Sequence, residues 1–230
     1  MRRRTVKSLL IRAMLIALLL AALGVAMLFY SRSWAPSRSQ YPLQGIAVSA
    51  DQGAIEWNTV RRRDVDFAYI RATSGSDRTD PRFAVNWAGA REAGLRYGAV
   101  HDFSLCRLAS DQATLFIATV PRDSAALPPV IRLAFDPGCA DRPARKTVLG
   151  ELSSLIRMIE AHGGKPALIR VAKDFDVLYD IGDGINRTLW LDGNLFPPDY
   201  AARPWVMWTA SNIRRVGGIA GPVDWSVVRP

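Results

Sequence analysis

The chain has 230 residues, of which 49% are hydrophobic and 22% charged, with 14 prolines and 17 glycines. This composition is typical of a globular protein and excludes collagen-like, low-complexity and wholly disordered chains. The formal net charge is +9, but seven basic residues and no acidic residue precede Tyr41; the remainder carries 23 Lys and Arg against 21 Asp and Glu. The basic excess therefore belongs to the N-terminus, and we expect no nucleic-acid partner.

The first predicted element is a membrane anchor at residues 13–30. This run, AMLIALLLAALGVAMLFY, contains no charge and has about the minimum length for a helix that crosses a bilayer. Basic residues stand before it, which by the positive-inside rule leaves residues 1–12 in the cytoplasm as a basic tail. A cleaved signal peptide is the alternative, although the run is long and no clear small-x-small cleavage site follows it. In either case the rest of the chain is exported.

Residues 31–43 are polar, contain prolines and are predicted to form a linker. With an uncleaved anchor, the protein would be single-pass in the inner (cytoplasmic) membrane. Residues 44–230 would then form a domain on the periplasmic or extracytoplasmic side.

From residue 44 onward, short apolar runs alternate with longer amphipathic stretches. The predicted strands are 45–48, 67–72, 97–103, 129–135, 167–171, 188–191 and 204–209. The predicted helices are 57–62, 83–93, 108–119, 145–162 and 173–181, and residues 182–184 are expected to form a turn. Strands separated by helices of this length favour parallel βαβ units, and hence an α/β layer or barrel.

The two cysteines, Cys106 and Cys139, both lie in the exported part. An oxidising compartment allows a disulfide to persist there, and two unrelated buried thiols are the alternative. Neither cysteine has the Cys or His neighbours that a metal site requires, so we expect no metal and no other cofactor.

Six segments in order carry a resemblance to a known family. They read GIAVSADQGAIEW (45–57), VDFAYIRATSG (65–75), DPRFAVNWAGAREAGLRYGAVH (80–101), LPPVIRLAFDPGC (127–139), PWVMWTA (204–210) and GPVDW (221–225). From about Gln44 to Val228 the chain resembles glycoside hydrolase family 25, the Ch-type lysozymes or N-acetylmuramidases. The resemblance implies a single domain folded as an irregular (β/α) TIM-like barrel, with its cleft at the carboxyl ends of the strands. It also implies an envelope glycan as ligand and favours pairing of Cys106 with Cys139.

The carboxylates that the family uses for catalysis are replaced in this chain. Cleavage of a glycosidic bond needs one carboxylic acid to protonate the leaving oxygen. A second carboxylate stabilises or attacks the sugar carbon, unless the substrate's acetamido group does so. The family has an Asp in Gly-Ile-Asp-Val-Ser and an Asp-x-Glu pair after its Pro-Pro strand, where this chain has Ala47, Arg132 and Ala134. A methyl group carries no proton, and a guanidinium stays cationic.

Asp102 and Asp224 are the fallback candidates for relocated catalytic acids. Asp224 matches a late Asp of the family, and Asp102 lies two residues after Val100, so strand alternation should aim it inward. The alternative role for Asp102 is an ion pair with Arg132. An unpaired guanidinium at the strand ends would be costly, so we expect Arg132 to pair with Asp102, Asp224 or both. Such a pair would occupy the space of the sugar's reacting carbon.

His101 and Trp208 complete the predicted cleft residues, which are His101, Asp102, Arg132, Trp208 and Asp224. His101 matches the family's strand histidine, for which a buried, hydrogen-bonded role is favoured over catalysis. Trp208 is predicted to face the cleft and stack on a sugar ring.

Three functions remain open from the sequence. The first is a membrane-anchored, exported lysozyme-like domain that has lost muramidase activity and binds peptidoglycan, another envelope glycan or an envelope protein. The second is an active muramidase that uses Asp102 and Asp224. The third is a structural interaction protein whose cleft is filled.

Overall fold

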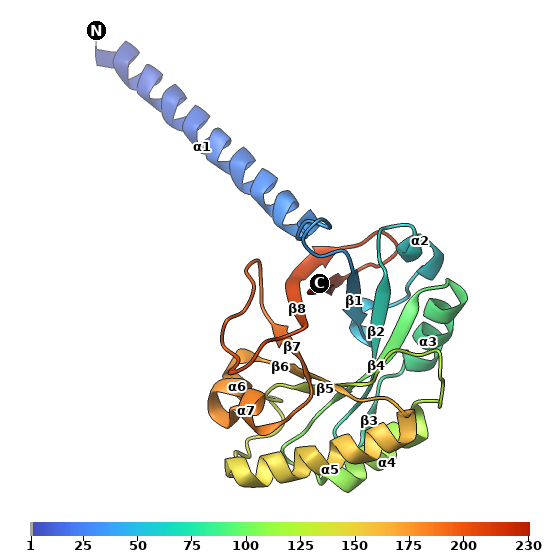
Figure 1. Cartoon of the computed structure of the whole chain (residues 1–230). Helices are drawn as coiled ribbons and strands as arrows, with labels where there is room; N and C mark the ends of the chain where they lie inside the picture. The colour runs from blue at the N-terminus through green and yellow to red at the C-terminus, as the bar shows by residue number, and fades with distance from the viewer. Residues whose placement is uncertain (1) are drawn as a thin grey trace. The chain divides into compact units, whose positions relative to one another are not determined.

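A computed structural model describes residues 2–230, with side chains at Arg12 and from Met14 onward. The chain divides into two compact units, one ending at Trp34 and the other spanning Ala35–Pro230. The first unit is one long helix, α1 (Arg2–Ser33) (Figure 1). Its segment Met14–Ser33 is long and apolar enough to cross a membrane, a property that signal sequences share. In the predicted tail 1–12, Arg12 is the one basic residue whose side chain the structure describes.

The second unit, which the structure describes in full, is a closed barrel of eight strands. These are β1 (Gln44–Val48), β2 (Phe67–Ser74), β4 (Arg96–Asp102), β5 (Val130–Leu133), β6 (Leu168–Val171), β7 (Thr188–Asp192), β8 (Met207–Arg215) and β9 (Pro222–Val228). Their order is β1-β9-β8-β7-β6-β5-β4-β2, and pairing of β1 with β2 closes the ring. The two-residue strand β3 (Arg78–Thr79) pairs with the end of β2.

The barrel departs from a regular parallel (β/α) barrel at one place. Strand β9 runs antiparallel to both β8 and β1, whereas the other neighbouring strands of the ring are parallel. The sequence predicts an α/β barrel, and this is found, but it does not predict β9. That strand begins at Pro222 and holds Asp224, residues that are depleted in strands.

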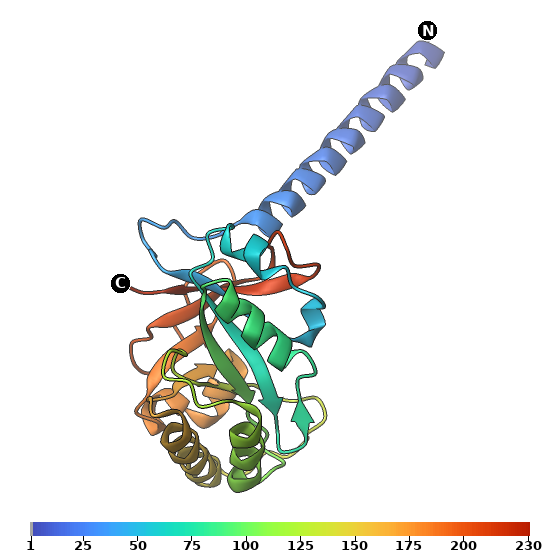
Figure 2. The same ribbon diagram turned by 90° about the vertical axis from the view of Figure 1, so that its right-hand side faces the viewer.

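Helices cover the outside of the barrel (Figures 1 and 2). They are α2 (Trp57–Arg61), α3 (Phe83–Glu92), α4 (Ala109–Thr119), α5 (Arg145–Gly163), α6 (Lys173–Tyr179) and α7 (Ile181–Gly184), with a 3-10 turn at Ala50–Gln52. Helix α5 buries its predicted apolar face and ends where Gly164 adopts a left-handed φ of 68°, a conformation that glycine tolerates. The expected turn at 182–184 is instead the end of α7.

Alternate residues of each strand point into the barrel and fill it. The buried interior cluster consists of Phe67, Tyr69, Val100, Val130, Leu168, Trp190 and Met207. Two residues further along five of these strands, the next inward position holds a charged side chain, whereas on β8 it holds Thr209. The charged residues are Arg71, Asp102, Arg132, Arg170 and Asp192, and Asp224 of β9 joins them because it is paired in register with Ala47. A layer of charges therefore lies above the apolar core, at the carboxyl ends of the parallel strands.

Candidate functional site

Two adjoining hollows open at the carboxyl ends of the strands. The larger has a volume of about 640 Å³ and is lined mainly by residues at the ends of β2, β4 and β5 and in the loops after them. The smaller, of about 260 Å³, lies over Ala47, Arg170 and Asp224. Arg71, Asp102 and Arg132 line both hollows, so the two form one cleft.

Arg170 of β6 is the central charged residue of this cleft. Its side chain is only 5% exposed. Its Nε donates a hydrogen bond to Asp192 Oδ1 at 2.7 Å, and its Nη2 donates to Asp224 Oδ2 at 2.6 Å. Burial alone would lower the pKa of the guanidinium, but the carboxylates of Asp192 and Asp224 outweigh this and raise the pKa above its ordinary value. One buried cation thus holds two carboxylates.

The interior aromatic layer supports this arrangement from below. The Arg170 guanidinium lies 4.8 Å from the ring centre of Trp190, within cation–π range. The indole N–H of Trp190 donates to Thr209 Oγ1 at 3.0 Å, and Thr209 Oγ1 donates to Asp192 Oδ1 at 3.2 Å. Asp192 is therefore held from two sides.

Arg132 pairs with only one of its two expected partners. Its Nη1 lies 3.6 Å from Asp102 Oδ1, because the two residues are in register on β5 and β4. Of the alternatives that the sequence leaves open, Arg132 therefore pairs with Asp102, and Asp224 is bound by Arg170 instead. The side chain of Arg132 is 35% exposed, so it borders the cleft without filling it.

Arg71 connects the cleft to the loops around it. Its Nε donates to Asp80 Oδ2 at 3.1 Å, and its Nη2 lies 3.3 Å from Asp51 Oδ2. The buried Asp80 carboxylate also accepts hydrogen bonds from the backbone N–H groups of Ala50 and Arg82, at 2.8 and 2.9 Å. Asp80 therefore fixes the loop after β1 to the loop after β2.

His101 lies outside the cleft, contrary to its inclusion among the cleft residues. It points away from the barrel interior toward α4, is fully buried and packs edge-on against Phe116. Its Nδ1 is 2.8 Å from Thr73 Oγ1 and its Nε2 is 3.1 Å from Gln112 Oε1. Burial lowers its pKa to about 4, although the Gln112 hydrogen bond opposes this. The imidazole is therefore neutral at pH 7 and has the buried, hydrogen-bonded role.

Trp208 also lies outside the cleft, so its predicted stacking position is wrong. The neighbouring residues Met207 and Thr209 take the inward positions of β8, which turns Trp208 to the outside of the barrel. There it is buried against Tyr41 and Trp205, with ring centres 6.2 and 6.3 Å away.

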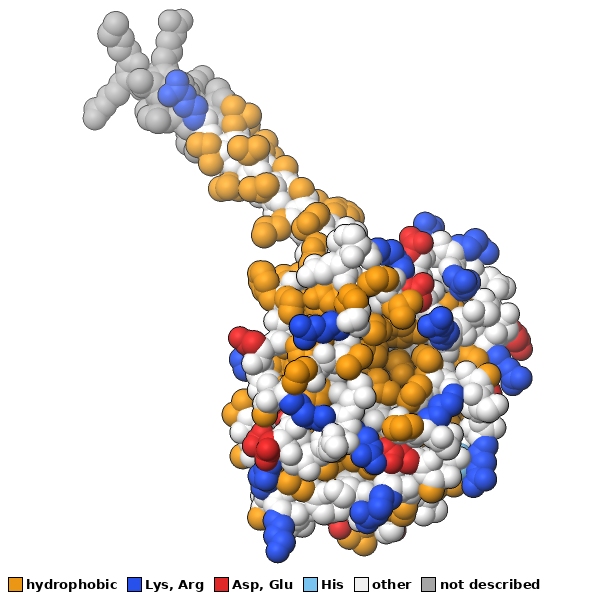
Figure 3. Space-filling view, viewed as in Figure 1, with side chains coloured by type: hydrophobic (Ala, Val, Ile, Leu, Met, Phe, Trp, Pro, Cys, Tyr) orange, Lys and Arg blue, Asp and Glu red, His pale blue; other side chains and the backbone are white. Residues whose placement is uncertain are grey.

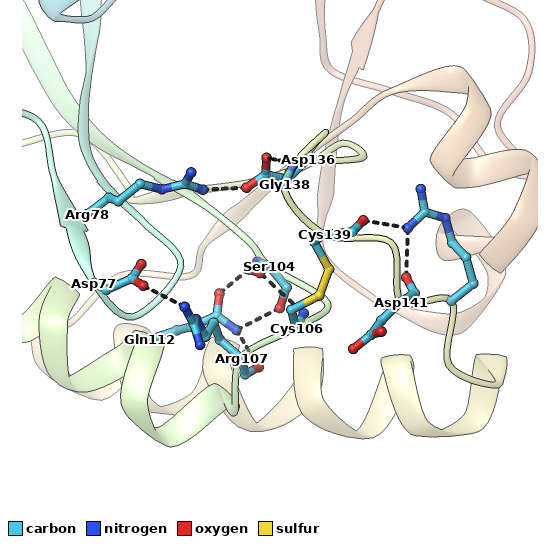
Figure 4. Close-up of a disulfide and its surroundings, with 11 residues drawn as sticks. Asp77, Arg78, Ser104, Cys106, Arg107, Gln112, Asp136, Gly138, Cys139 and Asp141 are labelled. Atoms are coloured by element: carbon cyan, nitrogen blue, oxygen red, sulfur yellow. Dashed lines mark hydrogen bonds and ion pairs between the residues drawn. A yellow bond between two sulfur atoms is a disulfide. The ribbon is translucent and has the colours of Figure 1, made fainter.

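A disulfide holds the rim of the larger hollow (Figure 4). Cys106 and Cys139, with Cα atoms 5.9 Å apart, join the loop after β4 to the loop after β5, which confirms the expected pairing. In the same rim Asp136 accepts hydrogen bonds from Arg78 and from the Gly138 N–H. The Arg78 hydrogen bond, more than any other contact, lowers the pKa of the Asp136 carboxyl.

Comparison with known proteins assigns the family. The family model described as glycosyl hydrolases family 25 matches residues 46–219. The chain belongs to glycosyl hydrolase family 25. Protein YegX of Escherichia coli K12 is 34% identical over 196 residues, which cover 82% of this chain and 70% of YegX. Lysozyme M1 of Streptomyces globisporus is 30% identical over 202 residues, covering 79% of this chain and 66% of that protein.

Solved structures of family 25 proteins share the fold. A family 25 glycosyl hydrolase from Bacillus anthracis superposes with a TM-score of 0.77 at 31% identity, covering 86% of this chain and 92% of that one. A bacterial lysozyme from Streptomyces coelicolor gives a TM-score of 0.72 at 25% identity, with 81% and 91% covered.

The cleft of this family 25 chain is poor in available carboxylates. Ala47 and Ala134 present methyl groups to the smaller and the larger hollow, and Arg132 presents a guanidinium to both. Within the residues that the structure describes, no three His, Cys, Asp or Glu side chains are grouped so as to hold a metal ion. The sequence does not single out Arg170, although its inward position two residues after Leu168 repeats the spacing of Val130 and Arg132.

Proposed function

We propose that this chain is a membrane-anchored, exported family 25 domain that binds peptidoglycan or a related envelope glycan without hydrolysing it. The observation that carries the proposal is the pairing of the cleft carboxylates with arginines. Asp192 and Asp224 share Arg170, and Asp102 faces Arg132. The positions that the resemblance assigns to catalytic carboxylates hold Ala47, Arg132 and Ala134.

The pairing argues against a muramidase with relocated acids. A general acid must carry a proton that it can donate to the leaving oxygen. Asp224 Oδ2 instead accepts a hydrogen bond from Arg170 at 2.6 Å. Asp102 Oδ1 lies 3.6 Å from Arg132 Nη1, so this carboxylate too faces an arginine.

The open cleft favours ligand binding over a purely structural role. Its two hollows, of about 640 and 260 Å³, are of a size that accommodates small ligands. Their lining includes arginine, aspartate and hydroxyl side chains, which can donate to and accept from the hydroxyl and acetamido groups of a glycan. The similarity to lysozymes, such as Lysozyme M1 of Streptomyces globisporus, favours a cell-wall glycan as the ligand.

The position of the linker suits a glycan-facing cleft. Residues 35–43 lead into the amino-terminal end of β1, while the cleft lies at the other end, after Val48. An anchor formed by the apolar part of α1 would therefore be connected through the end of β1 that does not carry the cleft. With residues 1–12 in the cytoplasm, the domain would stand outside the inner membrane.

Sedimentation with purified peptidoglycan tests the binding role, using the full chain in detergent micelles. We expect the chain to sediment with the glycan. Ala134→Trp, which fills the larger hollow, should abolish this, whereas Ala118→Trp on the exposed face of α4 should not. Equal sedimentation of the two variants, or no sedimentation of the unaltered chain, would contradict a glycan-binding cleft.

Mass spectrometry of the protein purified from its native membrane tests the anchor. We expect the apolar segment of α1 to be present in the mature protein. A mature N-terminus between Ser31 and Pro36 would show that the segment is a cleaved signal peptide.

A further inference from the structure

The side of the barrel around α2 carries a group of arginines that the cleft does not use. We call it the α2-side arginine cluster; its members are Arg38, Arg61, Arg62, Arg63, Arg214 and Arg215. They come from the linker, from the end of α2 and the turn after it, and from the end of β8. Figures 1 and 2 place the β8–β9 connection beside α2. It follows the carboxyl end of β8, where Arg214 and Arg215 pair with Val223 and Pro222. In Figure 3, Lys and Arg side chains gather over this region at the upper right.

Four members of the cluster surround a hollow of about 420 Å³. It is lined by Arg62, Arg63, Arg214 and Arg215, together with Asp64, Val216 and Gly217. The absence of a side chain at Gly217 allows this close approach, because a Cβ there would lie 2.9 Å from Arg63 Nε. The Arg214 guanidinium lies 4.1 Å from the ring centre of Trp225.

The cluster has more positive than negative charge. Its acidic neighbours are Glu56, Asp64 and Asp66, and Asp66 already pairs with Arg38 at 2.8 Å. Burial, and next the positive charge of Arg38, lower the pKa of Arg214, with Asp64 opposing them. An anion in the hollow would relieve this repulsion between the arginines.

The cluster lies a short length of chain from the apolar segment of α1. That segment ends at Ser33, five residues before Arg38, which corresponds to at most about 18 Å of extended chain. Arg38 is fixed to the barrel by hydrogen bonds to the Pro42 carbonyl at 2.9 Å and to Asp66 Oδ2 at 2.8 Å. A bilayer that contained the apolar segment would therefore be within reach of Arg38.

Exposed apolar side chains occur at the amino-terminal end of the barrel, where Arg38 binds the Pro42 carbonyl. Leu43 and Val206 are 39% and 42% exposed, and their carbonyl groups accept hydrogen bonds from Val228 and Arg229 at the end of the chain. Arginines beside exposed apolar side chains are typical of surfaces that rest on lipid headgroups, because a guanidinium forms bidentate hydrogen bonds with phosphate.

We infer that the α2-side arginine cluster binds the headgroups of anionic phospholipids and holds the α2 side of the barrel against the membrane surface. The inference rests on the proposed membrane anchorage. It adds a second contact between the domain and the bilayer, which fixes the direction of the cleft instead of leaving the domain free on its linker. The lipid charge rather than the headgroup identity is the recognised feature.

Amide hydrogen exchange of the full chain in nanodiscs tests the inference. One preparation contains phosphatidylcholine alone, and the other contains phosphatidylglycerol as well. We expect exchange in residues 61–64 and 214–218 to slow by about fivefold in the anionic nanodiscs. This is the change expected if one basic residue gains the attraction of the anionic surface. High salt should reverse the change because it screens the lipid charge.

Charge reversal identifies the residues responsible. Arg62→Glu with Arg215→Glu should remove the lipid-dependent slowing, whereas Lys146→Glu with Arg157→Glu, the same change of charge on exposed positions of α5, should retain it. Equal exchange in the two nanodiscs would overturn the inference, as would slowing that survives in the Arg62→Glu, Arg215→Glu variant.

Failure of the anchorage gives a different result. The full chain would then not float with neutral vesicles, whatever the state of the cluster. In that case salt-sensitive flotation with anionic vesicles, lost in the Arg62→Glu, Arg215→Glu variant, would still support lipid binding by the cluster. Absence of that flotation would overturn it.

Discussion

Arg170 on β6 and Asp224 on β9 form a 2.6 Å hydrogen-bonded ion pair between strands that are not neighbours in the barrel. The same guanidinium binds Asp192 of β7. Three strands are thus joined at the level where the cleft begins. The pair also engages Asp224, which lines the smaller hollow and is the one catalytic-site acid of the family that the resemblance finds in this chain.

Loss of Arg170 should destabilise the fold strongly. Arg170→Ala leaves Asp192 and Asp224 without their shared cation, and breaking a buried ion pair in this way costs about 3–5 kcal/mol. Urea denaturation followed by tryptophan fluorescence measures the loss, with the exposed Arg157→Ala on α5 as control. Adding Asp192→Asn and Asp224→Asn to Arg170→Met should recover much of the stability. A loss below about 1 kcal/mol in Arg170→Ala would show that the pairing is not structural.

Loss of Arg132 should cost much less. Its side chain is 35% exposed and lies 3.6 Å from Asp102, and solvent screens a pair of this kind. We expect Arg132→Ala to change the free energy of unfolding by less than about 1 kcal/mol in the same urea titration. A loss equal to that of Arg170→Ala would contradict the division of roles between the two arginines.

Protonation of His101 should weaken the fold in mild acid. Burial lowers its pKa to about 4 from an ordinary 6.5, so between these values the unfolded chain binds the proton more readily than the folded chain. The stabilisation is therefore complete above pH 6.5 and is lost as the pH falls toward 4, by on the order of 3 kcal/mol. Unfolding free energies of the unaltered chain and His101→Gln over this interval measure it. The His101→Gln variant should show a shallower pH dependence, and identical slopes would contradict the assignment.

Loss of the disulfide should loosen the rim of the cleft and destabilise the domain. Cys106 and Cys139 are 33 residues apart in sequence, and closing a loop of this size stabilises a protein by on the order of 3–4 kcal/mol in the chain-entropy model. The double variant Cys106→Ser, Cys139→Ser should lose this amount in thermal and urea denaturation. Dithiothreitol should destabilise the unaltered chain and leave the double variant unchanged; equal responses of the two would argue against a stabilising disulfide.

Much of the fold follows from local sequence patterns. Alternation of apolar strands with amphipathic helices predicts the α/β barrel, and the face of α5 is visible from its spacing alone. The antiparallel β9 is missed because its first residue is Pro222 and because Asp224 interrupts its apolar pattern. Its place in the ring depends on pairing with β1, which lies far away in the sequence.

The site is predictable only where strand alternation is unambiguous. In β4, the apolar Val100 identifies the inward-facing positions, and Asp102 is the next of them. The contact between Asp102 and Arg132 therefore follows from the sequence. In β8, Met207 and Trp208 are both apolar, and only the packing of the barrel decides that Met207 points inward. Arg170 is missed because its partners, Asp192 and Asp224, come from other strands and are brought to it by closure of the barrel.

The most direct test of the central claim is turnover of purified peptidoglycan by the full chain in detergent micelles, with released reducing ends and sedimented protein measured in the same sample. The pairing of Asp224 with Arg170 and the presence of Ala47, Arg132 and Ala134 at the cleft predict that the protein sediments with the glycan and releases no reducing ends. Release of reducing ends by the unaltered chain, abolished by Asp102→Asn or Asp224→Asn, would contradict the account and show that the catalytic acid has moved.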